Sequence, residues 1–245
     1  MSREMLILAV DTSTRTGSVA LLRDDVVLAE ISGHEETLYS SRLFRDMEVL
    51  KANAQFELSQ VDVFAVAAGP GSFTGLRVGL TAVKAWAEVH SKPIAAISGL
   101  EAISAQSEAI IGGLGPTNHV LAPFFDARRG QLFGALYRCV PGNRAGLELL
   151  GAESIFPPEE FVDMVKGSFQ LGEPTIVSPV PDLLPASLVE ARLPGVRIET
   201  VSAALATAIG RLGFERAKRG DLVDALSLDA NYVRRSDAEA AWSDV

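Results

Sequence analysis

Short apolar runs, each followed by a polar turn, open the chain. The run 5–10 ends in the turn 11–17, and the runs 18–22 and 26–31 follow within a few residues. Such closely spaced runs predict strands joined as antiparallel hairpins. Between residue 34 and about residue 54 the spacing becomes helical, which predicts an amphipathic helix. Its apolar positions are Leu38, Leu43, Met47 and Leu50, with Phe44 on the adjoining side.

The most distinctive stretch is the glycine-rich sequence 69–79, Gly-Pro-Gly-Ser-Phe-Thr-Gly-Leu-Arg-Val-Gly. An apolar run at 63–68 precedes it and an amphipathic segment to about His90 follows, so it predicts a strand, a turn and a helix N-terminus. Free N–H groups at a helix start favour an anion, which makes a phosphate cradle one interpretation. However, Leu76 and Arg77 follow Gly75 where a P-loop requires Lys and Ser or Thr. The alternative is a close-packed structural turn, and the spacing favours it.

The second half repeats the order of the first. The run 120–125 ends at Asp126, a polar turn follows at 127–130, and the segments 132–138 and 146–150 read as two further strands. We therefore predict an α/β fold of duplicated β-β-β-α-β-α units in two lobes facing across a cleft. The lobes are assigned to residues 1–110 and 111–245. An alternative for the last helix and the tail is that they pack back on the first lobe. That last helix is predicted at 202–219, with Ser202 as its N-cap.

Composition restricts the class of protein. Hydrophobic residues make up 48% of the 245-residue chain, which suits a compact globular protein. No apolar run approaches the ~20 residues needed to span a bilayer, so no membrane association is expected. Cys139 is the single cysteine, which indicates a reducing, cytoplasmic compartment. The formal net charge of −9 argues against a protein that holds nucleic acid by itself.

The chain offers few residues for catalysis. His34, His90 and His119 are too widely separated to resemble metal ligands, so we expect ordinary surface or helix-end roles and no metal. The stretch 71–75 has glycines around a serine but not the Gly-x-Ser-x-Gly spacing of a serine hydrolase. Cys139 lies in an apolar context and reads as a small core residue. No catalytic residue can therefore be named, and a peptidase has no candidate.

Four stretches, in order along the chain, resemble the TsaB family, also called YeaZ. They are Ile-Leu-Ala-Val-Asp-Thr-Ser-Thr at 7–14, Gly-Pro-Gly-Ser-Phe-Thr-Gly-Leu-Arg at 69–77, Phe-Asp-Ala-Arg-Arg-Gly at 125–130 and Asn-Tyr-Val-Arg at 231–234. The motif residues, to which we assign structural roles, are Gly69, Gly71, Ser72, Phe73, Thr74, Gly75, Arg77, Asp126, Tyr232 and Arg234. The duplicated plan likewise resembles the actin–hexokinase–Hsp70 superfamily of two-lobed ATPases, with a ribonuclease H-like core.

The resemblance implies a subunit of the machinery that makes N6-threonylcarbamoyladenosine in tRNA, beside the anticodon. A TsaD-type paralogue would transfer the threonylcarbamoyl group from threonylcarbamoyl-adenylate to adenine N6, with this chain as its non-catalytic activator. A TsaE-type ATPase would join the assembly, and the partners would hold most of the tRNA. The resemblance also implies that ATP or ADP and a metal belong to the partner subunit, with none on the isolated chain.

Two site expectations stay open at this stage. Asp11 and Thr12 stand where the superfamily places an acid near Mg-ATP, so they are candidate cofactor residues; the alternative is that they cap the hairpin turn. Asp126 invites the same comparison. A partner interface, or a homodimer when the partner is absent, could use apolar residues of the two helices, and the alternative is that these are all core. The interface candidates are Tyr39, Leu43, Leu76, Leu80 and Val83. A small-molecule kinase of the same superfamily is the alternative function.

Overall fold

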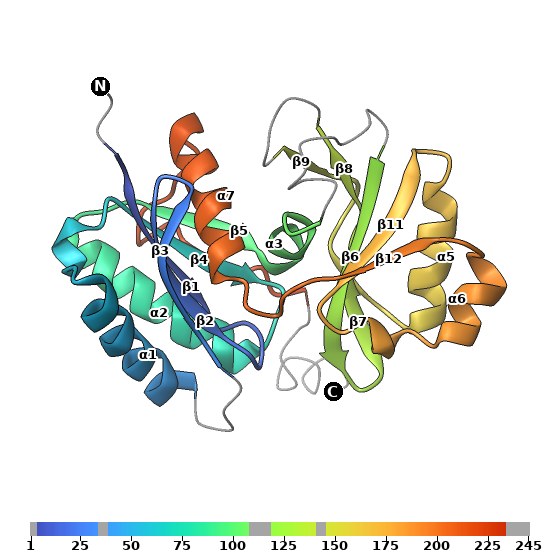
Figure 1. Cartoon of the computed structure of the whole chain (residues 1–245), viewed down its shortest axis with the longest axis horizontal. Coiled ribbons are helices and arrows are strands. Elements are labelled where there is room, and N and C mark those ends of the chain that lie inside the picture. The colour runs from blue at the N-terminus through green and yellow to red at the C-terminus, as the bar shows by residue number, and fades with distance from the viewer. Residues whose placement is uncertain (1–3, 34–38, 108–118, 141–145, 234–245) are drawn as a thin grey trace, which may run out of the picture. The chain divides into compact units, whose positions relative to one another are not determined.

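The structure is a computed structural model that describes residues 4–33, 39–107, 119–140 and 146–233 (Figure 1). These residues form two compact units. The first takes in the residues up to Gly99 together with those from Ala204 onward, and the second runs from Leu100 to Ala203. The sequence placed its boundary at residue 110 and left open whether the last helix returns to the first lobe. In the structure that helix, α7 (Ala206–Arg219), packs on the first sheet.

The first unit is built on a five-stranded sheet in the order β3-β2-β1-β4-β5. β1 pairs antiparallel with β2, and β2 pairs antiparallel with β3, as the hairpin pattern predicted. On the other side β1 pairs parallel with β4, and β4 pairs parallel with β5. The strands are β1 (Leu6–Asp11), β2 (Ser18–Arg23), β3 (Val26–Ser32), β4 (Val63–Gly69) and β5 (Ile94–Ser98).

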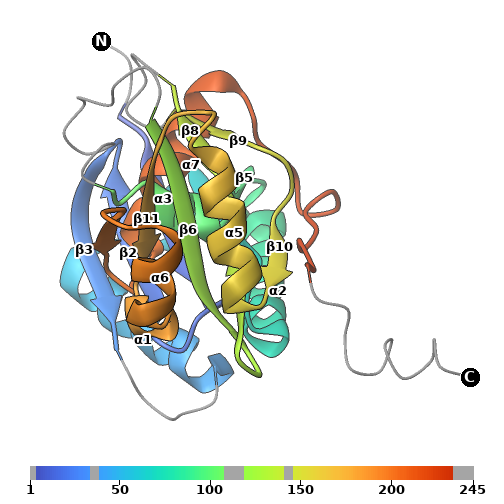
Figure 2. The ribbon, with the colours of Figure 1, turned by 90° about the vertical axis from the view of Figure 1, so that its right-hand side faces the viewer.

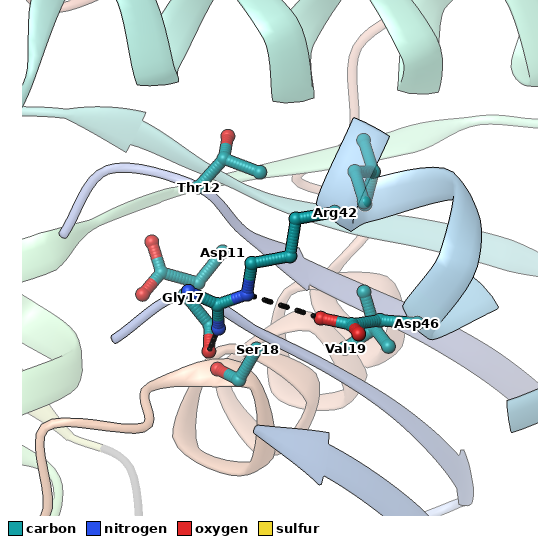
Figure 3. A pocket seen from close by; sticks show the side chains of 8 residues that line it. Asp11, Thr12, Gly17, Ser18, Val19, Arg42 and Asp46 are labelled. Carbon is teal, nitrogen blue, oxygen red and sulfur yellow. Dashed lines mark hydrogen bonds and ion pairs between the residues drawn. The ribbon is translucent and has the colours of Figure 1, made fainter. Parts of the chain in front are cut away.

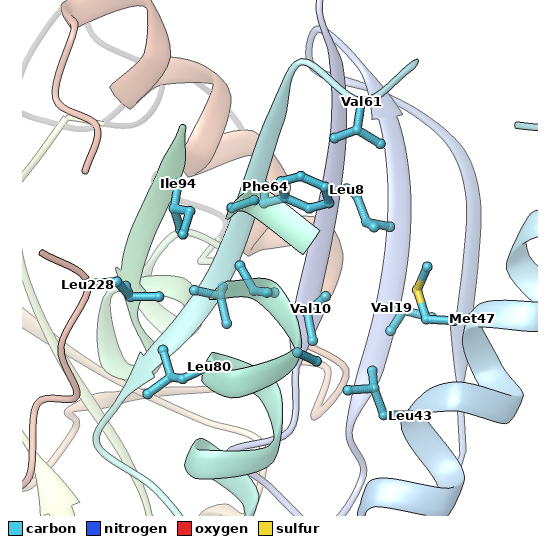
Figure 4. Packing of buried hydrophobic residues seen from close by; sticks show 14 of the residues in the cluster. Leu8, Val10, Val19, Leu43, Met47, Val61, Phe64, Leu80, Ile94 and Leu228 are labelled. Carbon is cyan, nitrogen blue, oxygen red and sulfur yellow. The ribbon is translucent and has the colours of Figure 1, made fainter. Parts of the chain in front are cut away.

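Helices cover both faces of this sheet, which explains why its central strands are apolar at nearly every position. Helices α1 (Tyr39–Ala54) and α2 (Phe73–His90) pack on one face and α7 on the other. Figure 4 shows the core under α1 and α2, where Leu8, Val10 and Phe64 of the strands meet helical side chains. Leu58–Gln60 forms a short 3-10 turn, η1, before β4.

The second unit repeats the same strand order, β10-β7-β6-β11-β12, which confirms the duplicated plan. The third strand of this repeat is Ser154–Phe156 and not the predicted run 146–150, which pairs with Tyr137–Cys139. Its strands are β6 (His119–Arg128), β7 (Gln131–Gly134), β8 (Tyr137–Cys139), β9 (Leu147–Leu149), β10 (Ser154–Phe156), β11 (Glu173–Ser178) and β12 (Arg197–Thr200). The predicted strand 132–138 is interrupted, and its halves β7 and β8 pair with successive parts of β6. Pro123 faces the interruption and has no N–H to give to the ladder.

Two helices of the second unit lie together on one face of its sheet. α5 (Pro158–Ser168) and α6 (Ala186–Arg192) pack side by side there, over a core that includes Phe124 and Phe161 (Figure 2). The sequence predicted irregular chain up to residue 195 and so missed α6 and the 3-10 turn η2 (Pro181–Leu183), and it made no prediction for the segment that forms β12. These elements are short, and prolines begin η2 and precede α6, which weakens a periodic signal.

The remaining helices, α3 and α7, begin close to the points where the chain passes from one unit to the other. α3 (Gly99–Ser104) begins at the last residue of the first unit. The N-terminus of α7 is at Ala206, four residues later than predicted, and its amide N–H donates to Ser18 Oγ of β2 at 2.9 Å. Its end at Gly220 is as predicted. Within the described residues no helix is long and apolar enough to cross a membrane.

Candidate functional site: the Asp11 turn and the glycine-rich turn

The Asp11 carboxylate is held by its own turn. Oδ1 accepts hydrogen bonds from the Ser13 amide N–H at 2.8 Å and from the Ser13 hydroxyl at 2.6 Å. Oδ2 accepts from the Thr14 hydroxyl at 3.3 Å. Asp11 is only 1% exposed, and this burial raises the pKa of its carboxyl, an effect that the bonds from Ser13 and Thr14 and the charge of Arg42 partly oppose. The side chain thus acts as a capping residue of the turn, one of the two roles that the sequence left open.

Arg42 of α1 fastens the same turn from outside, as Figure 3 shows. Its guanidinium donates to the carbonyl oxygens of Arg15 at 2.9 Å and Gly17 at 2.8 Å, and also to that of Thr16. Nε pairs with Asp46, one helical turn further along α1, at 3.2 Å. Arg42 is 6% exposed and Asp46 is 7% exposed, so the pair is buried. The turn between β1 and β2 is therefore tied to α1.

The hollow between these groups is small. It is lined by Asp11, Thr12, Gly17, Arg42 and Asp46 among others, and its volume of about 10 Å³ matches one water molecule. A phosphate group does not fit there. A larger hollow of about 420 Å³ lies at the start of β1 and the end of α1, beside Leu6, Arg23 and Phe56, and it contains none of the motif residues.

The glycines of the second motif make room for the Asp11 turn. A Cβ on Gly75 would collide with the Thr12 carbonyl oxygen, and one on Gly79 would collide with the Thr12 hydroxyl. A Cβ on Gly71 would lie 2.7 Å from the Ser13 Cβ. In return, Thr12 Oγ1 donates to the Gly75 carbonyl oxygen at 2.6 Å, and the Ser72 amide donates to the Ser13 carbonyl oxygen at 2.8 Å. The stretch is thus a close-packed corner.

The same corner receives the C-terminal segment of the first unit. The Asn231 amide donates to the Ala68 carbonyl oxygen at 2.7 Å, and its own carbonyl lies against Gly69, whose φ of 122° favours glycine. The Tyr232 ring packs against the Phe73 ring at a tilt of 40°, with ring centroids 5.1 Å apart. Motif residues that lie about 160 positions apart in the sequence therefore meet at one place. Ser72 caps α2 by accepting from the Gly75 amide at 3.3 Å.

The other candidates lie elsewhere. Asp126 belongs to the second unit, where it accepts from the Arg128 amide at 2.7 Å and pairs with the Arg128 guanidinium at 3.3 Å. His119 is 9% exposed and hydrogen-bonds with Thr175 at 3.0 Å, so the prediction of a surface or helix-end role is wrong for it. His90 ends α2 as predicted, and His34 and Arg234 lie outside the described residues. Among the residues that the structure describes, no three potential ligands are grouped to hold a metal.

The interface candidates need a correction. Leu43, Leu76, Leu80 and Val83 are all under 7% exposed and belong to the core of the first unit, which contradicts their assignment to a partner surface. The apolar stripes of α1 and α2 cover the first sheet, so these four side chains are already buried within the chain. The side chain of Tyr39 is not among those described. The outward apolar side chains of α1 are instead Phe44, 56% exposed, and Val49, 42% exposed.

Asp11 gives the stability of the protein a defined pH dependence. The pKa of its carboxyl in the folded state lies above the ordinary value of 3.8, so ionisation costs the folded state more than the unfolded state. The stabilising contribution of the protonated form is complete below the unfolded pKa and is lost as pH rises through the folded pKa. We expect Asp11→Asn to become more stable relative to the wild type as pH rises across that window. Urea unfolding of both proteins at several pH values measures this difference; a constant difference would contradict it.

Cys139 is buried, as the sequence predicted. Burial, with a smaller contribution from the charge of Glu199, raises the pKa of its thiol to about 11. Because the thiolate is the nucleophile, the native protein should react with a thiol reagent such as DTNB at pH 8 only after unfolding. Rapid modification of the folded protein would contradict this and would reopen a nucleophilic role.

The duplicated sheets and the topology of each unit define the actin-like ATPase fold that the sequence predicted. YeaZ from Pseudomonas aeruginosa has the same fold, with a TM-score of 0.72 and 25% identity over 93% of this chain and 99% of that one. Residues 35–160 match the family model described as TsaD: tRNA N6-adenosine threonylcarbamoyltransferase.

The curated relatives narrow the family further. The Bacillus subtilis (strain 168) tRNA threonylcarbamoyladenosine biosynthesis protein TsaB is 30% identical over 97% of this chain and 98% of its own length. The Escherichia coli (strain K12) protein of the same name is 32% identical over 55% of each chain. This chain therefore belongs to the TsaB family of tRNA threonylcarbamoyladenosine biosynthesis proteins.

Two features of the site were not predicted from the sequence. In the sequence, Arg42 and Asp46 have the i, i+4 spacing of an ordinary exposed ion pair on a helix. The one sign of their burial is that they are next to Leu43 and Met47, which belong to the apolar stripe. The contact of Asn231 with Gly69 joins opposite ends of the chain, and no local pattern indicates it.

Proposed function

We propose that this chain is a non-catalytic activating subunit of a tRNA N6-adenosine threonylcarbamoyltransferase complex. A TsaD-type partner would transfer threonylcarbamoyl from threonylcarbamoyl-adenylate to N6 of the adenosine 3′ of the anticodon. Besides family membership, the observation that carries the proposal is the filled Asp11 turn. A working kinase of this superfamily would bind phosphate with a glycine-rich turn at this position. This chain has Thr12 and Ser13 there instead, and both are already hydrogen-bonded within the chain, Thr12 to the Gly75 carbonyl and Ser13 to the Asp11 carboxylate.

The charged groups of the turn also support a chain that does not bind the nucleotide itself. The Asp11 carboxylate accepts hydrogen bonds from Ser13 and Thr14. The neighbouring guanidinium of Arg42 donates to three backbone carbonyls and pairs with Asp46. A phosphate or a hydrated Mg²⁺ would have to displace these bonds in a space of about 10 Å³. On this proposal, ATP or ADP and the metal are bound by the partner subunit.

The outer faces of α1 and α2 offer the partner surface. These two helices pack against each other, and Phe44 and Val49 of α1 and Val89 of α2 are exposed apolar side chains, with Val89 77% exposed. A helix-rich partner could cover them as neighbouring helices do in bundles, and a second copy of this chain could do so when the partner is absent. These outward residues replace the three core leucines and the core valine of the sequence-based prediction.

The net charge supports a complex in which the partners hold the nucleic acid. At −9 the chain would repel the phosphates of tRNA over most of its surface, so the proposed complex holds tRNA chiefly through the other subunits. A TsaE-type ATPase is the third proposed component, and the cytoplasm, where tRNA is modified, is the proposed location.

The non-catalytic assignment is tested on the isolated chain. Isothermal titration with ATP and Mg²⁺, combined with an assay for phosphate release, should show neither tight binding nor turnover. Tight binding with turnover that Asp11→Asn abolishes would contradict the proposal and would favour the small-molecule kinase, the alternative within the same superfamily.

A further inference from the structure

An exposed arginine, Arg77, lies one turn into α2 with its guanidinium over an aromatic ring. The guanidinium carbon of Arg77 lies 3.8 Å from the centroid of the Phe73 ring, one helical turn earlier. Its Nε donates to the Tyr232 hydroxyl at 3.4 Å, and the Tyr232 ring packs against Phe73 at a tilt of 40°. The position of Tyr232 is fixed in turn by the neighbouring bond from the Asn231 amide to Ala68 and by Leu228, which is buried in the core.

This arrangement leaves the binding end of Arg77 available. Nε and the stacked face are used, but the two terminal amino groups, Nη1 and Nη2, make no hydrogen bond or ion pair with any residue in the described part of the chain. Stacking and the tyrosine bond restrict the rotamers of a side chain that would otherwise move freely. The fork of donors is therefore oriented before any partner arrives, which lowers the entropy lost on binding.

The part of α2 around Arg77 carries no acidic residue, although the chain as a whole is acidic. Along the outward stripe of α2, Arg77 is followed by Thr81 and Lys84, and Glu88 near the end of the helix is its first acidic residue. No acidic residue lies in the first turn. Against a net charge of −9, this stripe is a local positive surface that favours an anionic group.

We propose that Arg77 is a docking point for a carboxylate of the TsaD-type partner, an aspartate or glutamate side chain that it binds through Nη1 and Nη2. This inference rests on the proposed function and adds the chemistry of one contact. The planar fork matches a carboxylate in bidentate geometry, and a partner that covers Phe73 and Tyr232 would shield the pair from water, which strengthens it.

A tRNA phosphate has the same charge but fits the surface less well. Affinity for a nucleic acid grows with the number of phosphates neutralised, and proteins that bind it make about 6–10 such contacts. The described stripe has Arg77 and Lys84, two helical turns apart. A single oriented arginine beside an apolar surface is instead the arrangement found at the centres of protein–protein interfaces.

The experiment measures the affinity of the full chain for its purified TsaD-type partner by isothermal titration calorimetry at two salt concentrations. Arg77→Met keeps the stem on Phe73 and removes the charge, and Arg77→Lys keeps the charge but removes the fork. Arg219→Met, at the exposed end of α7, is the matched control. We expect Kd to rise about tenfold or more for Arg77→Met and by less for Arg77→Lys, with no change for Arg219→Met. The salt dependence of binding should fall in Arg77→Met.

The outcomes separate this inference from the proposed function. If the wild-type chain binds no TsaD-type partner, the proposed function fails. If the wild type binds and Arg77→Met binds equally well, the docking role of Arg77 is wrong while the proposed function stands. A variant that keeps its affinity for the partner but loses affinity for tRNA in a filter-binding assay would assign Arg77 to phosphate and overturn the proposal. Circular dichroism of each variant confirms that it is folded.

Discussion

Replacing Gly75 by alanine is expected to destabilise the first unit by about 3 kcal/mol, and replacing it by valine should cost more, because the new Cβ would collide with the backbone of Thr12. The clash involves a carbonyl oxygen that cannot rotate away, since Thr12 follows β1 and donates its hydroxyl to the Gly75 carbonyl. Relief requires the Asp11 turn and the start of α2 to separate. Urea unfolding measures the loss, and unchanged stability would show that the corner is not close-packed.

Gly79 provides a sharper comparison on the same helix. Its added Cβ would meet the Thr12 hydroxyl, which is a side-chain atom, so Thr12→Ala should recover much of the loss caused by Gly79→Ala. The same change should recover little of the loss caused by Gly75→Ala, where the clash is with the backbone. Gly167→Ala, in α5 with nothing within 4 Å of the new Cβ, is the control and should be neutral or slightly stabilising. Equal recovery in both double variants would contradict this account of the two glycines.

Arg42→Met is expected to cost about 3–5 kcal/mol, because it leaves the buried Asp46 carboxylate without its partner and three carbonyls without a donor. The double variant Arg42→Met with Asp46→Leu should regain part of this loss, since it removes the uncompensated charge as well. Arg45→Met changes a neighbouring arginine whose side chain is 51% exposed, and the expected change there is under about 1 kcal/mol.

Arg42 also connects stability to the pKa of Asp11. Its charge opposes the effect of burial, so its removal should raise the pKa of Asp11 further and should make the variant lose stability more steeply as pH rises from about 4. Urea unfolding of the variants across this range of pH measures both effects. A loss no larger for Arg42→Met than for Arg45→Met would show that the guanidinium does not hold the turn.

Local patterns were sufficient to predict the strands and helices of the first unit and the corner at the glycine-rich turn. The run 63–68 could only be a buried strand, and the glycines that follow predicted close backbone approach. What approaches them could not be predicted, because Thr12, Ser13 and Asn231 come from distant parts of the sequence. The duplicated order was visible in the second unit, although Pro123 interrupted one predicted strand.

The errors at the site have a common physical cause. A helical stripe such as Leu76, Leu80 and Val83 shows that one face is apolar but not whether that face meets the same chain or another. Here the first sheet takes these side chains, and the surface available to a partner carries isolated apolar residues such as Phe44. Likewise, the i, i+4 spacing of Arg42 and Asp46 is common on exposed helices and does not indicate burial. The pair is buried because the Asp11 turn folds over it.

Reconstitution of the modification tests the central claim most directly. Unmodified tRNA is incubated with the TsaD-type and TsaE-type proteins, threonylcarbamoyl-adenylate and ATP, with this chain present, absent or replaced by a variant, and threonylcarbamoyladenosine is quantified in the digested tRNA. Phe44→Asp, on the outer face of α1, is the interface variant, and Phe169→Asp, an exposed phenylalanine of the second unit, is its control. We predict modification with the wild type and the control, reduced modification with Phe44→Asp, and background levels without the chain. Modification that proceeds equally well without the chain would contradict its assignment as an activating subunit.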